Sequence, residues 1–127
     1  MNDEEINRLA DVVRETGFQI HKYHRHGHLE KIYENALAHR LRKLGFRVES
    51  QFPISVFDED GTPLGNYFAD LLVERRLVVE IKASSGIADE HIAQVLGYLR
   101  SSRFEHGLLL NFGASRFQIK KLKLEAL

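Results

Sequence analysis

Two neighbouring apolar segments, residues 66–73 and 77–83, are separated by three charged residues, 74–76. This pattern predicts two antiparallel strands joined through a three-residue tip. With a tip of that length, the last residue of the first strand faces the first residue of the second. Stepping back along both strands then places Asp70 directly opposite Glu80. The hairpin therefore predicts that two carboxylates lie side by side on otherwise apolar strands.

A third charged residue belongs to the same group. Side chains alternate between the two faces of a strand, so Lys82 shares the face of Glu80 and, in this register, the face of Asp70. A register of the other parity would separate Asp70 from Glu80.

The rest of the chain predicts two helices before this hairpin, and one more strand, one more helix and two further strands around it. Local signals mark several boundaries: Asn2 with Glu5 resembles a helix-capping box, Gly45 suits a helix end, and Pro53 favours an edge strand. Asp60-Gly61 is typical of a hairpin turn. The expected helices are 2–22, 29–44 and 89–103, and the further strands are 46–56, 108–110 and 117–122.

The element order ααβββαββ favours an α/β fold in which helices flank a mixed β-sheet. The sequence has no repeats, no low-complexity stretch and only two prolines, so residues 1–127 are expected to form a single domain. With 43% hydrophobic and 28% charged residues, the composition is that of a globular protein and argues against disorder.

Composition also limits the expected location and the kinds of site. The chain has no cysteine, which excludes disulfides and thiolate metal sites and fits a reducing compartment. Its first residues are acidic, and no apolar run approaches the roughly 18 residues needed to span a bilayer. The expectation is therefore a cytoplasmic protein with no membrane partner.

Lysine plus arginine equals aspartate plus glutamate at 18 each, giving zero net charge. This balance argues mildly against tight binding of DNA, although local clusters can act regardless of the total. Two such clusters are residues 120–123 and the group Arg40, Arg42 and Lys43. Short basic runs of this kind are usually solvated surface, and that interpretation is preferred here.

Opposed carboxylates repel one another, so a fold that places them together usually supplies a cation. Their oxygen ligands suit Mg²⁺ or Mn²⁺. Such a cation could bind a phosphodiester and activate water, with Lys82 positioning or deprotonating that water. Spacing alone is equally compatible with a salt-bridged, solvent-facing group that does no chemistry.

Four motifs in order resemble the PD-(D/E)XK nuclease superfamily, and more closely the group called GxxExxY proteins, over nearly the whole chain. The motifs are residues 27–33 (GHLEKIY), 67–73 (YFADLLV), 79–83 (VEIKA) and 94–98 (QVLGY), with Leu110-Asn111-Phe112 beyond them. The resemblance implies a restriction-endonuclease-like fold. It also implies a metal bound by Asp70, Glu80 and the Ile81 carbonyl, with Lys82 acting in catalysis.

The resemblance adds further candidates on the helices. Glu30 corresponds to a helical glutamate that reaches toward the metal in related nucleases, and Gln94 with Tyr98 looks like a Gln-x-x-x-Tyr element beside the active site. Glu30 could instead be a surface residue stabilised by the helix dipole, and the Gln94–Tyr98 pair could be plain helix packing. The usual Gly-Pro-Gly-Leu turn is reduced here to Gly27.

Four histidines, at positions 21, 24, 26 and 28, precede the second helix. They allow a zinc hypothesis, but loop histidines without cysteine are more often solvated. His21 and His91 could also be neighbours of the active site or plain surface groups.

Two functions remain open from the sequence. The first is an Mg²⁺- or Mn²⁺-dependent hydrolase of nucleic-acid phosphodiesters, with DNA as the first expectation for the substrate. The second is a module that keeps the fold but acts by binding or assembly, with a homodimer as one form. The neutral charge supports the second, and the motifs support the first.

Overall fold

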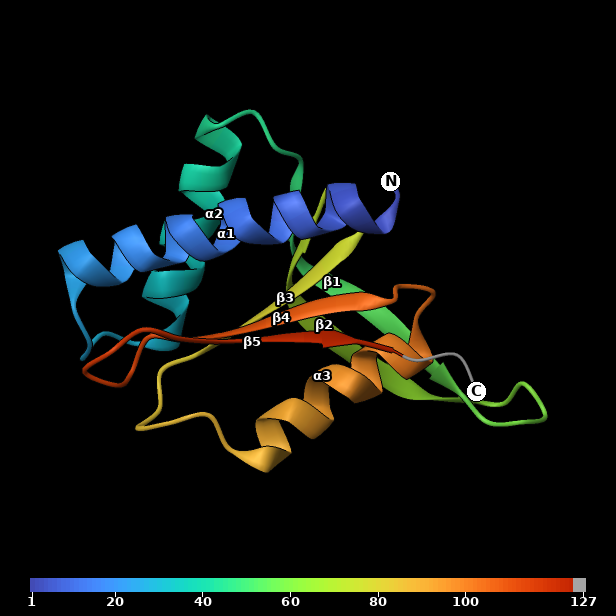
Figure 1. The fold of residues 1–127 in the computed structure, drawn as a ribbon. Coiled ribbons are helices and arrows are strands. Elements are labelled where there is room, and N and C mark those ends of the chain that lie inside the picture. Colours follow the sequence, from blue (N-terminus) through green and yellow to red (C-terminus); the bar gives the residue numbers. More distant parts are fainter. Residues whose placement is uncertain (125–127) are drawn as a thin grey trace.

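The structure is a computed structural model that describes residues 1–124, and it consists of one β-sheet with helices on both faces (Figure 1). The elements follow one another as α1 (Asp3–His24), α2 (Glu30–Lys43), β1 (Val48–Phe57), β2 (Pro63–Val73), β3 (Leu77–Lys82), α3 (Asp89–Ser101), β4 (His106–Asn111) and β5 (Gln118–Lys123). The predicted order ααβββαββ is confirmed.

The five strands lie in the order β1-β2-β3-β4-β5. The β3–β4 pair is parallel and the other three pairs are antiparallel, so the sheet is mixed, as predicted. Parallel neighbours need a crossover connection, and α3 supplies it between β3 and β4. β1 is an edge strand, which suits Pro53 because proline cannot donate a main-chain hydrogen bond.

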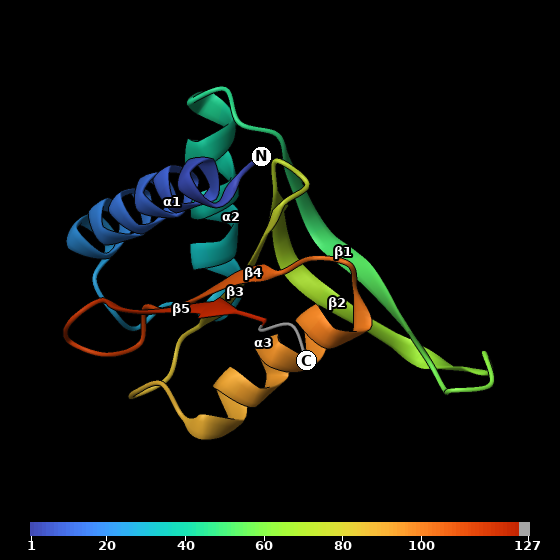
Figure 2. The same cartoon turned by 45° about the vertical axis from the view of Figure 1, so that its right-hand side comes forward.

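The hairpin register agrees with the sequence prediction. Val73 pairs with Leu77, and the pairing continues back to Leu71 with Val79. Beyond that point β2 pairs with β1 alone, so the outer half of the β1–β2 hairpin projects away from the rest of the sheet (Figure 2). Asp70 and Glu80 therefore lie where β2 and β3 part.

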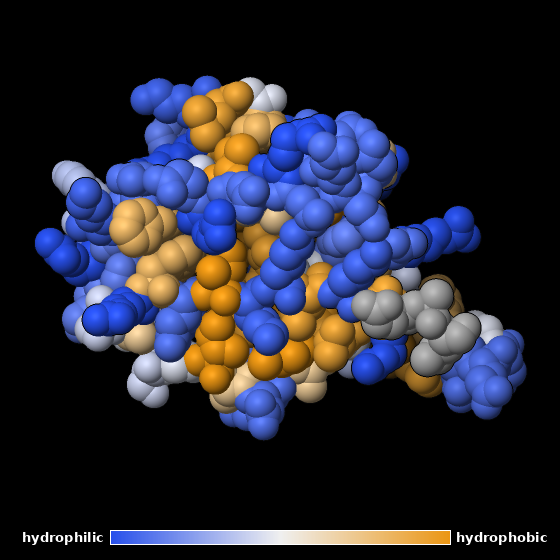
Figure 3. Space-filling view, in the orientation of Figure 1, coloured by the Kyte–Doolittle hydropathy of each residue, from blue (hydrophilic) through white to orange (hydrophobic). Residues whose placement is uncertain are grey.

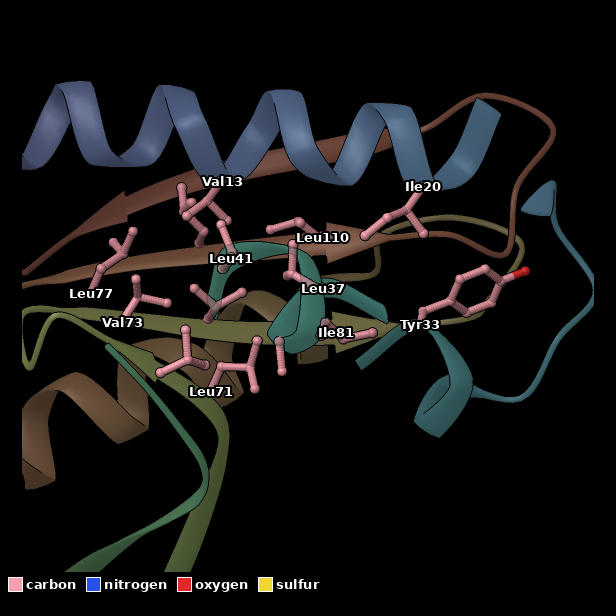
Figure 4. Close-up of a cluster of buried hydrophobic side chains, with 14 of the residues drawn as sticks. Val13, Ile20, Tyr33, Leu37, Leu41, Leu71, Val73, Leu77, Ile81 and Leu110 are labelled. Atoms are coloured by element: carbon pink, nitrogen blue, oxygen red, sulfur yellow. The ribbon is translucent and has the colours of Figure 1, made fainter. Parts of the chain in front are cut away.

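Two apolar clusters secure the sheet from its two faces. The larger lies between the sheet and helices α1 and α2, and Figure 4 shows part of it. The other lies between the sheet and α3, around Val95 and Leu99. β3 and β4 contribute to both clusters, with fully buried Val79 and Leu109 on opposite faces. Each large side chain buried in this way contributes about 1.5–3 kcal/mol.

The helix ends follow the local signals in the sequence. At the start of α1, the Glu5 amide donates to the Asn2 side chain over 2.8 Å, and the Asn2 amide donates to the Glu5 carboxylate over 3.3 Å. After α2, Gly45 adopts φ 95°, a left-handed conformation that glycine reaches at little cost.

Hydrophilic side chains dominate the face shown in Figure 3, around an apolar strip near the middle of the view. Among the helices within residues 1–124, none is long and apolar enough to cross a membrane.

The ends of β3 and β4 are locked together just beyond the sheet. The Phe112 amide donates to the Lys82 carbonyl over 2.9 Å, and the buried Asn111 side chain bonds both the amide and the carbonyl of Ser84 over 3.0 Å. A Cβ at Gly113 would lie 2.3 Å from the main chain of Ala83 and Ser84. The close approach of these two main-chain segments therefore requires glycine at position 113.

We predict that Gly113→Ala lowers the free energy of unfolding by about 1–3 kcal/mol, because the backbone that follows Lys82 must move. Gly97→Ala is the matched control, since it adds the same methyl group within α3, where no described atom beyond the adjoining residues and the helix's own backbone lies within 4 Å. It should stabilise the protein by about 0.5–1 kcal/mol. Urea unfolding measures both, and equal stability of the two variants would contradict the prediction.

Candidate active site

Asp70 and Glu80 interlock where β2 and β3 part. The Asp70 amide donates to Glu80 Oε1 over 3.0 Å, and the Ile81 amide donates to Asp70 Oδ2 over 2.8 Å. Each carboxylate thus accepts a main-chain N–H from the opposite strand, beyond the last paired residues Leu71 and Val79. The predicted neighbourhood of the two acids is present, and their orientations are fixed by the backbone.

Lys82 completes the predicted group of three. Its Nζ lies 4.0 Å from Glu80 Oε2, and its side chain is 16% exposed. Because Phe112 and Asn111 fix the backbone around Lys82, the ammonium group lies at the end of a rigid strand.

The electrostatics of the pair are unfavourable for two ionised carboxylates. Burial raises the pKa of Asp70 to about 6. The hydrogen bond from the Ile81 amide lowers this pKa, and the nearby charge of Glu34 raises it further. Burial and the charge of Asp70 raise the pKa of Glu80 to about 8, although Lys82 acts in the other direction. Without a cation, the pair of carboxyl groups therefore holds a proton more tightly than free carboxyl groups do.

Tyr98 of α3 reaches the pair and Gln94 lies at the surface. The Tyr98 hydroxyl donates to Glu80 Oε2 over 3.4 Å, and the residue is 4% exposed. Burial and the charge of Glu80 raise the pKa of Tyr98, so its hydroxyl remains a donor. Gln94 lies one helical turn earlier and is exposed.

The helical glutamate beside Asp70 is Glu34 and not Glu30. Glu30 is the exposed first residue of α2, whereas Glu34 is 4% exposed. Glu34 Oε2 accepts from Lys31 Nζ over 2.6 Å, and Glu34 contributes to the raised pKa of Asp70. The difference of one turn arises because packing of α2 on the sheet, which sequence periodicity does not specify, decides which turn meets Asp70.

Gln51 connects these two carboxylates and was not predicted. Its side-chain amide donates to Glu34 Oε1 over 3.0 Å and to Asp70 Oδ1 over 3.2 Å. Gln51 has φ 53°, a strained conformation for a residue with a side chain, and such residues cluster at functional sites. A glutamine in an edge strand gave no signal of this role.

Other possible ligands lie elsewhere. His21 Nε2 lies 2.9 Å from the Ala114 carbonyl oxygen, and the rings of His24 and His28 meet edge to face. Within residues 1–124, the histidines at 21–28 do not bring three ligand atoms together. Asp3, Glu105 and His106 do so at the start of β4, the opposite end of that strand from Asn111 and the Lys82 region. Lys123 already contacts Asp3 there.

Comparison with known proteins gives one family match. Residues 7–122 match the model of a family described as the PD-(D/E)XK nuclease superfamily. Among curated proteins, none matches the chain.

One solved structure similar to this chain is the crystal structure of SSO0001. The TM-score is 0.62 at 19% sequence identity, with 76% of this chain and 50% of that chain covered. The chain thus spans about half the length of that protein, and at this identity the likeness concerns the fold.

The raised pKa values predict that the metal-free protein loses stability as the pH rises. A carboxyl with a higher pKa in the folded state binds its proton more tightly there. Its contribution to stability is complete below the pKa of the unfolded state and is lost as the pH rises to the pKa of the folded state. For Asp70 this loss is complete above a pH of about 6, and for Glu80 above about 8. The free energy of unfolding should fall by on the order of 2 kcal/mol between about pH 5 and 8.

Urea unfolding with a chelator present measures this dependence. Glu80→Gln should flatten the curve above a pH of about 6, whereas Glu90→Gln, at an exposed position of α3, should leave it unchanged. A wild-type curve that is level or rising over this range would contradict the prediction.

Proposed function

The chain belongs to the PD-(D/E)XK nuclease superfamily, and from this premise we propose that it is a divalent-metal-dependent nuclease that hydrolyses phosphodiester bonds. DNA is the first substrate to test, and Mg²⁺ or Mn²⁺ is the proposed ion. Within the superfamily we propose the GxxExxY group and a cytoplasmic location. Residues 27–33 support the grouping, because the hydroxyl of the motif tyrosine, Tyr33, bonds the backbone of Arg25 and His28 and shapes the turn before α2.

The observation that carries the proposal is the interlocked pair of Asp70 and Glu80. Each of these two carboxylates is fixed by the backbone of the opposite strand. Burial raises the pKa of both, with Glu34 adding to the shift of Asp70 and Asp70 adding to the shift of Glu80, so the arrangement does not favour stability. The same arrangement fits a hard divalent cation, which prefers oxygen ligands and would remove the repulsion. The donor set therefore fits the proposed ion.

We propose Asp70, Glu80 and the Ile81 carbonyl as the metal ligands. When bound, the ion supplies positive charge to the phosphate and makes water a stronger nucleophile. Lys82, 4.0 Å from Glu80, can bind a phosphate oxygen or orient the attacking water. Tyr98 fixes the Glu80 carboxylate through its hydroxyl.

We assign to Glu34 the role that the family resemblance suggested for Glu30. Its carboxylate shares the Gln51 amide with Asp70, so Gln51 sets the distance between two acids on different layers of the fold. In this arrangement Glu34 either contacts the ion through water or orients Asp70. Removing a group that hydrogen-bonds to a metal ligand typically lowers metal affinity or activity by about 10- to 100-fold.

The alternative is a non-catalytic module that acts by binding or assembly, as a homodimer in one form. Zero net charge favours it, because the charge total offers little long-range attraction for nucleic acid. Calorimetric titration with Mg²⁺ and Mn²⁺ separates the two functions. Absence of metal binding, together with a neutral or stabilising Asp70→Asn, would favour the module.

We predict that purified protein with Mg²⁺ or Mn²⁺ cuts nucleic acid and that Lys82→Ala lowers the rate by at least about 100-fold. The circular dichroism spectrum should be unchanged, because the Lys82 side chain lies at a strand end and is partly exposed. Duplex, single-stranded and flap DNA and RNA are the substrates to compare. No cleavage of any of them by the wild type would refute the proposed nuclease.

We further predict that Glu34→Gln weakens Mg²⁺ binding or cleavage by about 10-fold or more, because it alters the shared hydrogen bonds with Gln51 and Asp70. Glu30→Gln is the matched control, with the same chemical change one turn away at an exposed position. It should alter either quantity by less than about twofold. The reverse order of the two variants would return the helical role to Glu30.

A further inference from the structure

An exposed aromatic ring lies one side chain away from the Asp70–Glu80 pair. Tyr67, on β2, has its ring centroid 5.2 Å from that of Tyr98, with the two planes inclined by 47°. Tyr98 is 4% exposed and contacts Glu80, whereas Tyr67 is 46% exposed. The ring of Tyr98 therefore lies between the Glu80 carboxylate and the solvent-exposed ring of Tyr67.

The position of Tyr67 explains its exposure. Tyr67 pairs with Ile54 of β1 in the part of β2 that projects beyond β3 (Figure 2). Leu64 and Phe68 in the same part are 62% and 52% exposed. Successive side chains alternate between the two faces of a strand, so Phe68 lies on the other face of β2 from Tyr67. Tyr67 differs from Leu64 and Phe68 because its ring packs on a residue that contacts Glu80.

We propose that Tyr67 is a stacking platform for a nucleobase of the substrate, next to the phosphate that is cut. The inference rests on the proposed nuclease function and adds a substrate class. A base can lie on this ring only when its own face is free of a stacked neighbour, so the substrate is single-stranded or frayed at the site of cleavage.

The charge of the protein supports a nucleobase as the occupant. With 18 basic and 18 acidic residues, little affinity for nucleic acid comes from the net charge, and the two carboxyl groups of Asp70 and Glu80 offer phosphate no attraction of their own. Contacts to the bases must then supply part of the binding. Stacking on an aromatic ring is tolerant of sequence and changes affinity by about 5- to 150-fold per base.

The first experiment uses fluorescence. The chain contains no tryptophan, so Tyr67→Trp, combined with Lys82→Ala to prevent cleavage, carries a single indole at the proposed platform. A thymidine 12-mer added with Mg²⁺ should quench its emission, whereas an abasic strand of equal length and charge should not. Phe18→Trp in the same background is the matched control, because Phe18 is 48% exposed on α1, on the other face of the sheet. Its emission should stay constant.

The second experiment measures affinity, in the Lys82→Ala background with Mg²⁺. Tyr67→Ala should weaken binding of the 12-mer by at least about 5-fold, and Tyr67→Phe should retain it within about twofold, because a phenyl ring still stacks. Mg²⁺ affinity should be equal in both variants, which separates loss of the platform from damage to the Glu80 region.

The outcomes distinguish this inference from the nuclease proposal. If the wild type cuts nucleic acid but Tyr67→Trp is not quenched and Tyr67→Ala binds normally, the inference is overturned and the nuclease stands. If Tyr67→Ala instead converts a dimer into a monomer with oligonucleotide binding intact, the ring belongs to a contact between two copies and the inference is again overturned. Quenching without cleavage by the wild type would support the platform and refute the nuclease.

Discussion

The mutual hydrogen bonding of Asp70 and Glu80 with the opposite backbone is the constraint on which the site depends. Where β2 leaves β3, main-chain N–H groups of Asp70 and Ile81 would otherwise lose their strand partners, and each finds a carboxylate oxygen instead. The divergence of the strands thus requires acceptors at these two positions, and the acceptors it uses are charged. The geometry that completes the backbone hydrogen bonding also concentrates negative charge.

The surrounding layers fix this pair from three directions. From α2, Glu34 approaches through Gln51; from α3, Tyr98 donates to Glu80; and from β4, the Asn111 network fixes the backbone after Lys82. Neighbours on separate elements can stay in register only because the sheet between them is rigid, with β3 and β4 buried on both faces. The apolar core therefore stabilises the protein and also holds the residues of the site in position.

Much of this could be predicted from the sequence because it follows from local rules. The three-residue tip at 74–76 set the pairing of Val73 with Leu77. The two-residue period of the strands then placed Asp70, Glu80 and Lys82 close together. Glu30 shows the limit: the family resemblance suggested a glutamate on this helix, but which turn of α2 lies beside Asp70 depends on how the helix packs against β1 and β2. Glu34 carried a usable signal, since it lies with Leu37, Ala38 and Leu41 on the buried stripe. Gln51 carried none, because its role depends on a backbone angle.

A chain with zero net charge, whose candidate site contains the two acids Asp70 and Glu80, cannot attract a polyanion by its net charge. If a divalent ion neutralises the pair, the repulsion of phosphate at the site is removed while the rest of the surface changes little. Binding of the substrate would then depend on the ion and on contacts made within a few ångströms of it. Under the proposed function, such a site would select the geometry of a strand at the point of cleavage in preference to its total charge, and the metal and the residues around it would govern affinity and chemistry together.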